Sequence, residues 1–163
     1  MLTLPKIVDR AETHYAAIAQ ELRIPFGEAV GPLLDEAAGY LGGAGVGNFG
    51  PAVFRYDVID MPRLEMQFGF VTPRAVAGND RVKPGILPAG KYVTVTYTGP
   101  YDDLESVTAV VIGWARQKAI EWDSTPGPNG EHFASRFEIY LNGPVDEPDP
   151  QKWQTEIWIK TRG

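Results

Sequence analysis

The chain repeats one order of predicted elements twice, and this repeat limits the folds that it can adopt. Each half is expected to run strand, helix, strand, strand, because alternating apolar residues mark the strands and apolar residues three and four apart mark the helices. A proline followed by an aromatic residue leads into each helix, as Pro25-Phe26 and as Pro100-Tyr101. The repeat predicts an α+β fold in which two such modules are related by a pseudo-two-fold axis.

The first module is assigned to residues 1–75. Its helix is expected at residues 26–41, where the apolar residues share one face, and its hairpin at residues 52–71. Residues 6–20 are rich in Ala and Glu, which favour a helix by propensity. The repeat makes this stretch the counterpart of residues 91–98, and therefore predicts a strand instead.

The second module is assigned to residues 86–163 and follows a surface connection at 74–86 that is rich in Gly and Pro. Its helix is expected at residues 102–122. Three strands are predicted from alternation and from β-branched and aromatic content, at residues 91–98, 135–141 and 155–160. Together the modules predict one domain over residues 1–163, with an antiparallel sheet, two main helices and a central groove, a common place for small molecules to bind.

Charge and composition exclude several classes of function. The net charge is −6, from 21 acidic and 15 basic residues, and no basic cluster occurs, so we expect no direct nucleic-acid binding. The chain has no cysteine and only two histidines, His14 and His132, which excludes disulfides, thiolate metal sites and His-rich metal sites. The glycines at 42–47 follow a helix rather than a strand, the reverse of a phosphate loop. Neither a metal nor a cofactor is expected.

The hydropathy pattern predicts a cytoplasmic protein with no membrane partner. No segment approaches the roughly 18 apolar residues that a membrane-spanning helix requires. The first residues also lack the basic stretch and apolar run of a secretory signal.

The strand at residues 135–141 holds the most informative carboxylate. Strict alternation places Arg136, Glu138 and Tyr140 on one face, with Phe137, Ile139 and Leu141 on the other. If the first face is exposed, Glu138 is an ordinary surface charge, as most strand carboxylates are. If that face lines a cavity, Glu138 is a buried anion that needs a partner, and a missing partner implies a ligand. The pattern alone allows both.

Five segments, taken in order, resemble the GyrI-like small-molecule-binding family. These segments are Glu65-Met66-Gln67-Phe68-Gly69-Phe70-Val71, Leu87-Pro88-Ala89-Gly90-Lys91-Tyr92, Thr98-Gly99-Pro100-Tyr101-Asp102-Asp103-Leu104, Trp114 and Glu138-Ile139-Tyr140. The family includes effector-binding domains of bacterial multidrug-responsive transcription activators. The resemblance implies that Glu138 faces a central groove, where it meets cationic aromatic ligands. No helix-turn-helix precedes the domain, so a stand-alone member is expected.

The resemblance and the aromatic content suggest which residues line that groove. A carboxylate among aromatic rings suits a delocalised cation, because it offers a counter-charge together with π-faces. The candidate ligand-binding residues are Glu138, Tyr140, Trp158, Trp114, Tyr56, Phe68 and Tyr92. Trp114 also suits a core position in its helix, and the strand register decides which of the others face inward.

Three functions are open at this point. The first is binding of hydrophobic, often cationic, aromatic molecules with Glu138 as the buried counter-charge. The second, implied by stand-alone relatives, is hydrolysis of cyclopropane-containing DNA-alkylating compounds, with Glu138 as general acid or base. The third is a protein-interaction module like the gyrase-inhibitory members of the family, with a protein as partner.

Overall fold

The helices and strands follow the predicted repeat, except that the single strand predicted for residues 6–20 is divided into two strands. Strands that were not predicted lie at residues 82–87, before the second module, and at residues 124–127 and 130–133, after its helix. The computed structural model describes residues 1–163. The strands are β1 (Lys6–Arg10), β2 (Thr13–Arg23), β3 (Ala52–Asp60), β4 (Arg63–Val71), β5 (Val82–Leu87), β6 (Gly90–Thr98), β7 (Ser124–Gly127), β8 (Gly130–Phe133), β9 (Arg136–Tyr140) and β10 (Gln154–Lys160). The helices are α1 (Gly27–Gly43) and α2 (Leu104–Gln117), with short 3-10 helices η1 (Tyr101–Asp103) and η2 (Pro150–Lys152).

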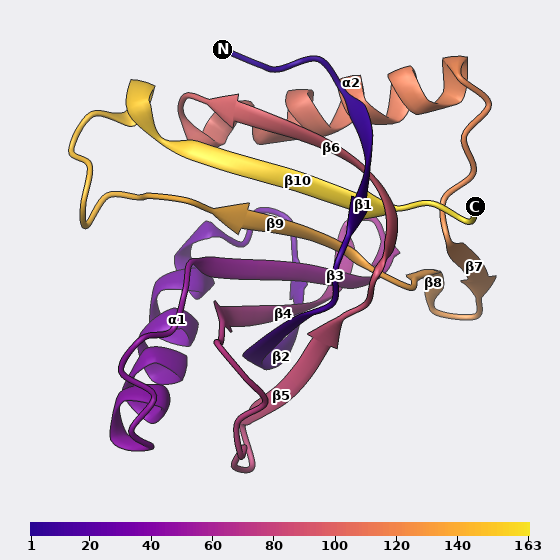
Figure 1. Cartoon of the computed structure of the whole chain (residues 1–163). Helices are drawn as coiled ribbons and strands as arrows, with labels where there is room; N and C mark the ends of the chain where they lie inside the picture. The colour runs from indigo at the N-terminus through magenta and orange to yellow at the C-terminus, as the bar shows by residue number, and fades with distance from the viewer.

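All ten strands belong to one antiparallel sheet, which confirms the predicted α+β class. Eight of them run in the order β1-β6-β10-β9-β3-β4-β2-β5, and the β7-β8 hairpin joins the sheet beside β3 (Figure 1). The order β6-β10-β9 of the second module mirrors β2-β4-β3 of the first, so the pseudo-two-fold axis passes between β9 and β3. The two modules therefore meet along these two strands.

Each module has an edge strand that comes from outside its own predicted set of strands. β1, the first part of the stretch predicted as one strand of the first module, pairs with β6 of the second module, and β5 pairs with β2 of the first. The prediction of a surface connection throughout residues 74–86 was therefore wrong for β5, which contains Pro84 and Gly85. An edge strand tolerates proline because one side of its backbone has no ladder partner.

Helix α2 ends earlier than predicted. Its last residue is Gln117, whereas the apolar spacing had predicted a helix to residue 122. Ala119 has a φ of 56°, and the Ile120 amide bonds back to the Ala115 carbonyl, a left-handed turn of the kind that ends helices. The chain beyond it reaches the β7-β8 hairpin.

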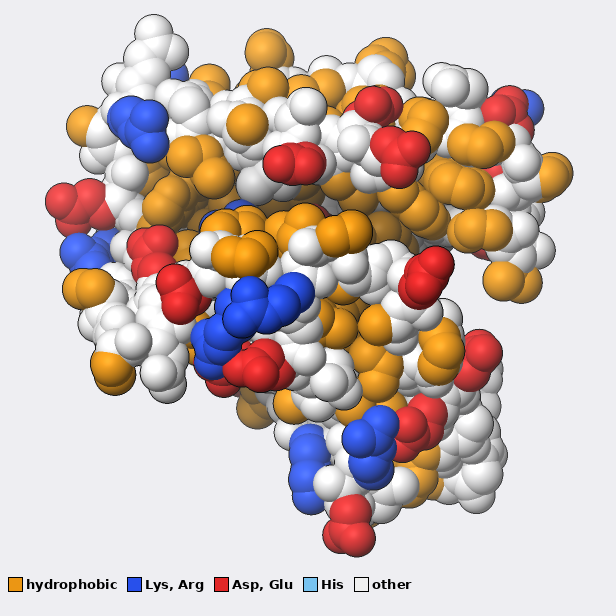
Figure 2. All heavy atoms as spheres, turned by 180° about the vertical axis from the view of Figure 1, so that it is seen from behind, with side chains coloured by type: hydrophobic (Ala, Val, Ile, Leu, Met, Phe, Trp, Pro, Cys, Tyr) orange, Lys and Arg blue, Asp and Glu red, His pale blue; other side chains and the backbone are white.

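Both helices pack on the same face of the sheet and leave its middle free. α1 lies over β2 and β4, and α2 lies over β6. Seen from the side opposite to Figure 1, a hollow lined mainly by hydrophobic side chains crosses the molecule between its upper part, which holds α2, and its lower part, which holds α1 (Figure 2). We call the strip of this face over β9 and β3 the central groove. Neither helix is long and apolar enough to cross a membrane.

Candidate functional site

Strand register places Glu138 on the floor of the central groove. Glu138 lies opposite Phe54 of β3 and Ile157 of β10, and paired residues in neighbouring strands share a face. Phe54 belongs to the core that α1 covers, and Ile157 to the core that α2 covers. Glu138 is therefore on the helix-bearing face, and only 6% of it is exposed. It is not a surface charge.

Two tyrosines hold the carboxylate. The Tyr140 hydroxyl donates to Oε1 at 2.7 Å, and the Tyr56 hydroxyl donates to Oε2 at 3.1 Å. None of the ion pairs in the structure includes Glu138. The carboxylate is thus positioned by neutral donors and has no counter-charge in contact.

Burial shifts the pKa values of Glu138 and of the two tyrosines that contact it. Desolvation raises the pKa of Glu138, although the two phenol hydrogen bonds and the charge of Arg136 act in the opposite direction. The pKa values of Tyr56 and Tyr140 lie well above their ordinary value, because both phenols are desolvated and face the carboxylate. Both tyrosines therefore stay protonated and keep donating.

Aromatic rings continue from Glu138 toward one end of the groove. The Tyr140 ring lies 4.4 Å from that of Phe54 and 5.4 Å from that of Tyr101, centroid to centroid. Tyr101 in turn stacks on Trp153 at 4.3 Å. The Trp153 Nε1 donates to the Glu147 carbonyl, which fixes the indole. The rings of Phe54, Tyr140, Tyr101 and Trp153 thus form a continuous series of contacts, which we call the aromatic wall. The Glu138 carboxylate lies at its base.

At the other end lies a cation. Arg136 precedes Glu138 by two residues and so shares its face of β9. Its guanidinium carbon lies 5.5 Å from the centre of the Tyr56 ring and 4.9 Å from that of Phe133. Burial lowers the pKa of Arg136, and its charge is favoured by Tyr56, Glu138 and Glu131. It remains a cation, because an arginine ionises far above neutral pH.

The structure brings Tyr56 and Tyr140 to Glu138, but not Phe68 or Trp114. Phe68 is fully buried beneath α1, against Phe26 and Phe54. Trp114 is partly buried at the edge of the core that α2 covers. Phe68 therefore contacts the site only through Phe54, and Trp114 packs with its own helix, as its spacing had also suggested.

Trp158 and Tyr92 lie on the opposite face of the sheet, which corrects the expectation that they share a groove with Glu138. Trp158 lies opposite Phe137 in the ladder, and side chains alternate along a strand, so it cannot share a face with Glu138. Tyr92 packs against Trp158 and Phe137 there. The Arg10 guanidinium covers this second core at 4.4 Å from the Trp158 ring.

Tyr101 and Trp153 were missed as site residues by the sequence reasoning. Tyr101 had a signal, since it is the aromatic residue after Pro100 in the repeat and in the family motif. Trp153 had none, because it follows a proline-rich loop with no periodic pattern. Tertiary structure alone places it on Tyr101.

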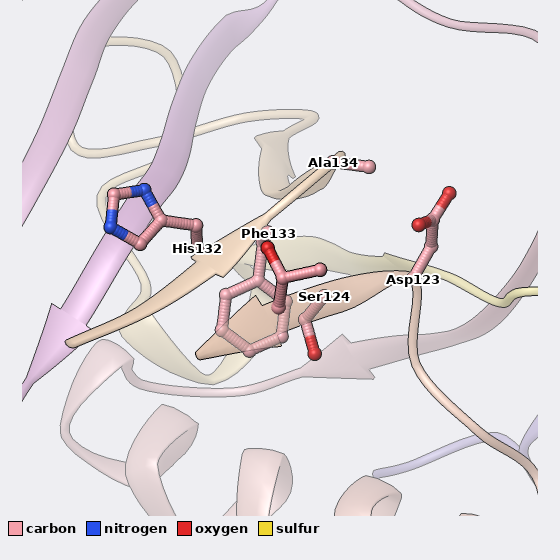
Figure 3. A pocket seen from close by; sticks show the side chains of 6 residues that line it. Asp123, Ser124, His132, Phe133 and Ala134 are labelled. Atoms are coloured by element: carbon pink, nitrogen blue, oxygen red, sulfur yellow. The ribbon is translucent and has the colours of Figure 1, made fainter. Parts of the chain in front are cut away.

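A separate cavity of about 220 Å³ lies at the β7-β8 hairpin (Figure 3). Asp123 there pairs with Lys160 at 2.9 Å, and the Ser124 hydroxyl donates to Glu131 at 2.9 Å. His132 points away from both Asp123 and Ser124 in Figure 3. The hairpin therefore contains no serine activated by a histidine.

Comparison with solved structures shows the same fold in several proteins. The C-terminal domain of EcmrR has 16% sequence identity and a TM-score of 0.69, with 98% of this chain and 97% of that domain covered. Against the whole EcmrR chain, solved in a complex with DNA, the identity is 15% and the TM-score 0.70, with 97% of this chain covered. The present chain spans only 57% of that longer protein.

Two further structures bear on ligands and chemistry. SAV2435, solved bound to tetraphenylphosphonium, has 14% identity and a TM-score of 0.63, with 99% of this chain and 95% of that chain covered. A Listeria innocua protein described as a hydrolase has 14% identity and a TM-score of 0.62, with 96% and 91% covered. At these identities the likeness is one of fold.

Family comparison gives the assignment directly. No curated protein matches the chain with significant similarity. The family model described as the GyrI-like small molecule binding domain matches residues 4–162, which is almost the whole chain. This confirms the resemblance that the sequence motifs suggested. The chain belongs to the GyrI-like small-molecule-binding domain family.

Proposed function

We propose that this chain binds hydrophobic, often cationic, aromatic small molecules in the central groove, with Glu138 as the counter-charge. The observation that carries the proposal is a buried carboxylate without an ion-pair partner at the foot of an aromatic wall. Removing a carboxylate from water is costly, and a cationic ligand would supply the missing partner.

The neighbouring groups suit that ligand. Two phenols hold Glu138 in place without neutralising it, so its charge remains available to a cation. The rings of Phe54, Tyr140, Tyr101 and Trp153 offer π-faces, which attract cations and bury apolar surface. Tetraphenylphosphonium, the ligand of SAV2435, combines both properties and supports this class of ligand for the present chain.

Replacing Glu138 by Gln is expected to weaken tetraphenylphosphonium binding at least ten-fold, about 1.4 kcal/mol. Glutamine keeps the shape of the side chain but removes the charge. Tryptophan fluorescence reports the titration, because Trp153 stands in the aromatic wall.

The matched control is Glu156→Gln, which removes one negative charge from β10 on the opposite face, where Glu156 accepts from the Trp158 indole. This variant should bind as the wild type does. Equal affinities for the Glu138 variant and the wild type would refute the role of Glu138 as counter-charge.

Hydrolysis is a second candidate, favoured by the raised pKa of the buried Glu138 carboxyl. A carboxyl whose pKa is raised keeps its proton to a higher pH than an ordinary glutamate does, which suits a general acid. The Listeria innocua protein described as a hydrolase supports considering this chemistry. The test is incubation with a cyclopropane-containing alkylating compound: a mass increase of one water with the wild type, and none with Glu138→Gln, would identify an enzyme. The protein partner that the family resemblance suggested stays a prediction.

A further inference from the structure

The central groove contains a second charge that the proposed function does not use. Arg136 lies on the same face of β9 as Glu138, and its side chain makes no hydrogen bond and no ion pair. Its contacts are with the faces of Tyr56 and Phe133. A guanidinium carries five N–H donors in a planar fork. Because no protein acceptor contacts those of Arg136, they are free to bind an acceptor group of a ligand.

Tyr56 keeps the two charges of the groove apart. Its ring lies under the Arg136 guanidinium, while its hydroxyl donates to Glu138. Two residues along a strand span about 6.6 Å. Glu138 and Glu131 are the carboxylates whose charges act on Arg136, and neither forms an ion pair with it. The groove thus contains an anion, Glu138, and a cation, Arg136, separated by the Tyr56 ring. Neither has an ion-pair partner within the protein.

We infer that the groove selects aromatic molecules that carry an anionic or strong acceptor group beside their cationic part, with Glu138 binding the cationic part and Arg136 the acceptor. This inference rests on the proposed function, and names the class of ligand within it. A ligand with only a positive charge meets attraction from Glu138 and repulsion from Arg136. An acceptor group on the ligand would instead make a charge-assisted hydrogen bond with Arg136. A carboxylate can make two such bonds at once, as a bidentate pair with the guanidinium.

The inference is tested with a matched pair of dyes. Unsubstituted rhodamine with a free benzoate is a zwitterion, and its methyl ester is a plain cation with the same aromatic body. Fluorescence anisotropy should show that the wild type binds the free acid at least ten-fold more tightly than the ester. Arg136→Gln should abolish this preference, by weakening binding of the acid and not of the ester. Arg116→Gln, at an exposed position of α2, is the matched control and should keep it.

The outcomes separate the inference from the function on which it rests. If neither dye nor tetraphenylphosphonium binds, the proposed function fails. If the wild type binds acid and ester equally, the proposed function stands and the inference on Arg136 is wrong. If Arg136→Gln tightens binding of both dyes, Arg136 is an internal competitor for Glu138 and the inference is again wrong. The comparison of acid and ester binding by the wild type needs no variant. It therefore tests the inference even if Arg136→Gln does not fold.

Discussion

Replacing Phe68 by Ala is expected to lower the free energy of unfolding by about 3–5 kcal/mol, the usual loss for removing a buried phenyl ring. Phe68 is fully buried and packs against Phe26 and Phe54 beneath α1, so the variant leaves a cavity that the rigid sheet cannot close. For a domain of this size the melting temperature should fall by about 6–20 °C. Thermal and denaturant unfolding measure the effect.

Binding distinguishes a core residue from a groove residue. Phe68 reaches the aromatic wall only through Phe54, so the folded variant should still bind tetraphenylphosphonium with nearly the wild-type affinity. Val110→Ala, at a position of α2 that is 49% exposed, is the control for losing apolar atoms and should change stability little. Unchanged stability together with lost binding would place Phe68 in the groove, as the sequence had suggested.

Glu138→Gln is expected to stabilise the ligand-free protein at neutral pH by about 1–3 kcal/mol, the range for a poorly compensated buried polar group. This corresponds to a melting temperature higher by about 2–12 °C. Glutamine can accept from either tyrosine and carries no charge, so it avoids the desolvation that raises the pKa of Glu138. A site residue that weakens its own fold is the expected signature of a group kept for binding.

The pH dependence follows from the direction of the pKa shift. A carboxyl whose pKa is raised in the folded state binds its proton more readily there than in the unfolded chain. Its contribution to stability is therefore fully present below the ordinary glutamate pKa of 4.5, and is lost as the pH rises through the raised folded value. The advantage of Glu138→Gln should be largest at neutral pH and should vanish in acid.

Melting temperatures of wild type, Glu138→Gln and Glu156→Gln from about pH 4 to about pH 8 measure this difference. Glu156→Gln, on the opposite face, should show no such trend. A constant difference at all pH values, or a wild type more stable than Glu138→Gln at neutral pH, would mean that the buried carboxylate carries no penalty.

Much of the fold could be predicted because both halves of the chain contain the same order of predicted strands and helix. The helix of residues 26–41 and the strand of residues 91–98 have strong local patterns, and the repeat transfers each assignment to its counterpart. It overrode the helix propensity of residues 6–20, which form β1 and part of β2. The edge strand β5 escaped prediction because Pro84 and Gly85 are turn formers, and only its position at the edge makes them acceptable.

The site could be predicted only where residues share one strand. Alternation along β9 is enough to bring Arg136, Glu138 and Tyr140 to one face. Trp158 and Tyr92 were assigned to the wrong face because the register between strands is set by the whole sheet. A shift of one residue in register moves every side chain of a strand to the opposite face. Trp153 comes from an irregular loop and joins the site through tertiary packing alone.

The most direct test of the central claim is a crystal structure with tetraphenylarsonium, the arsenic counterpart of tetraphenylphosphonium, whose heavy atom is located by anomalous scattering. We expect a single arsenic peak in the central groove, about 6 Å or less from the rings of Tyr140 and Tyr101 and beside the Glu138 carboxylate. A peak at another place, such as the cavity at the β7-β8 hairpin or the one lined by Ile7, Lys91 and Arg162, would contradict it.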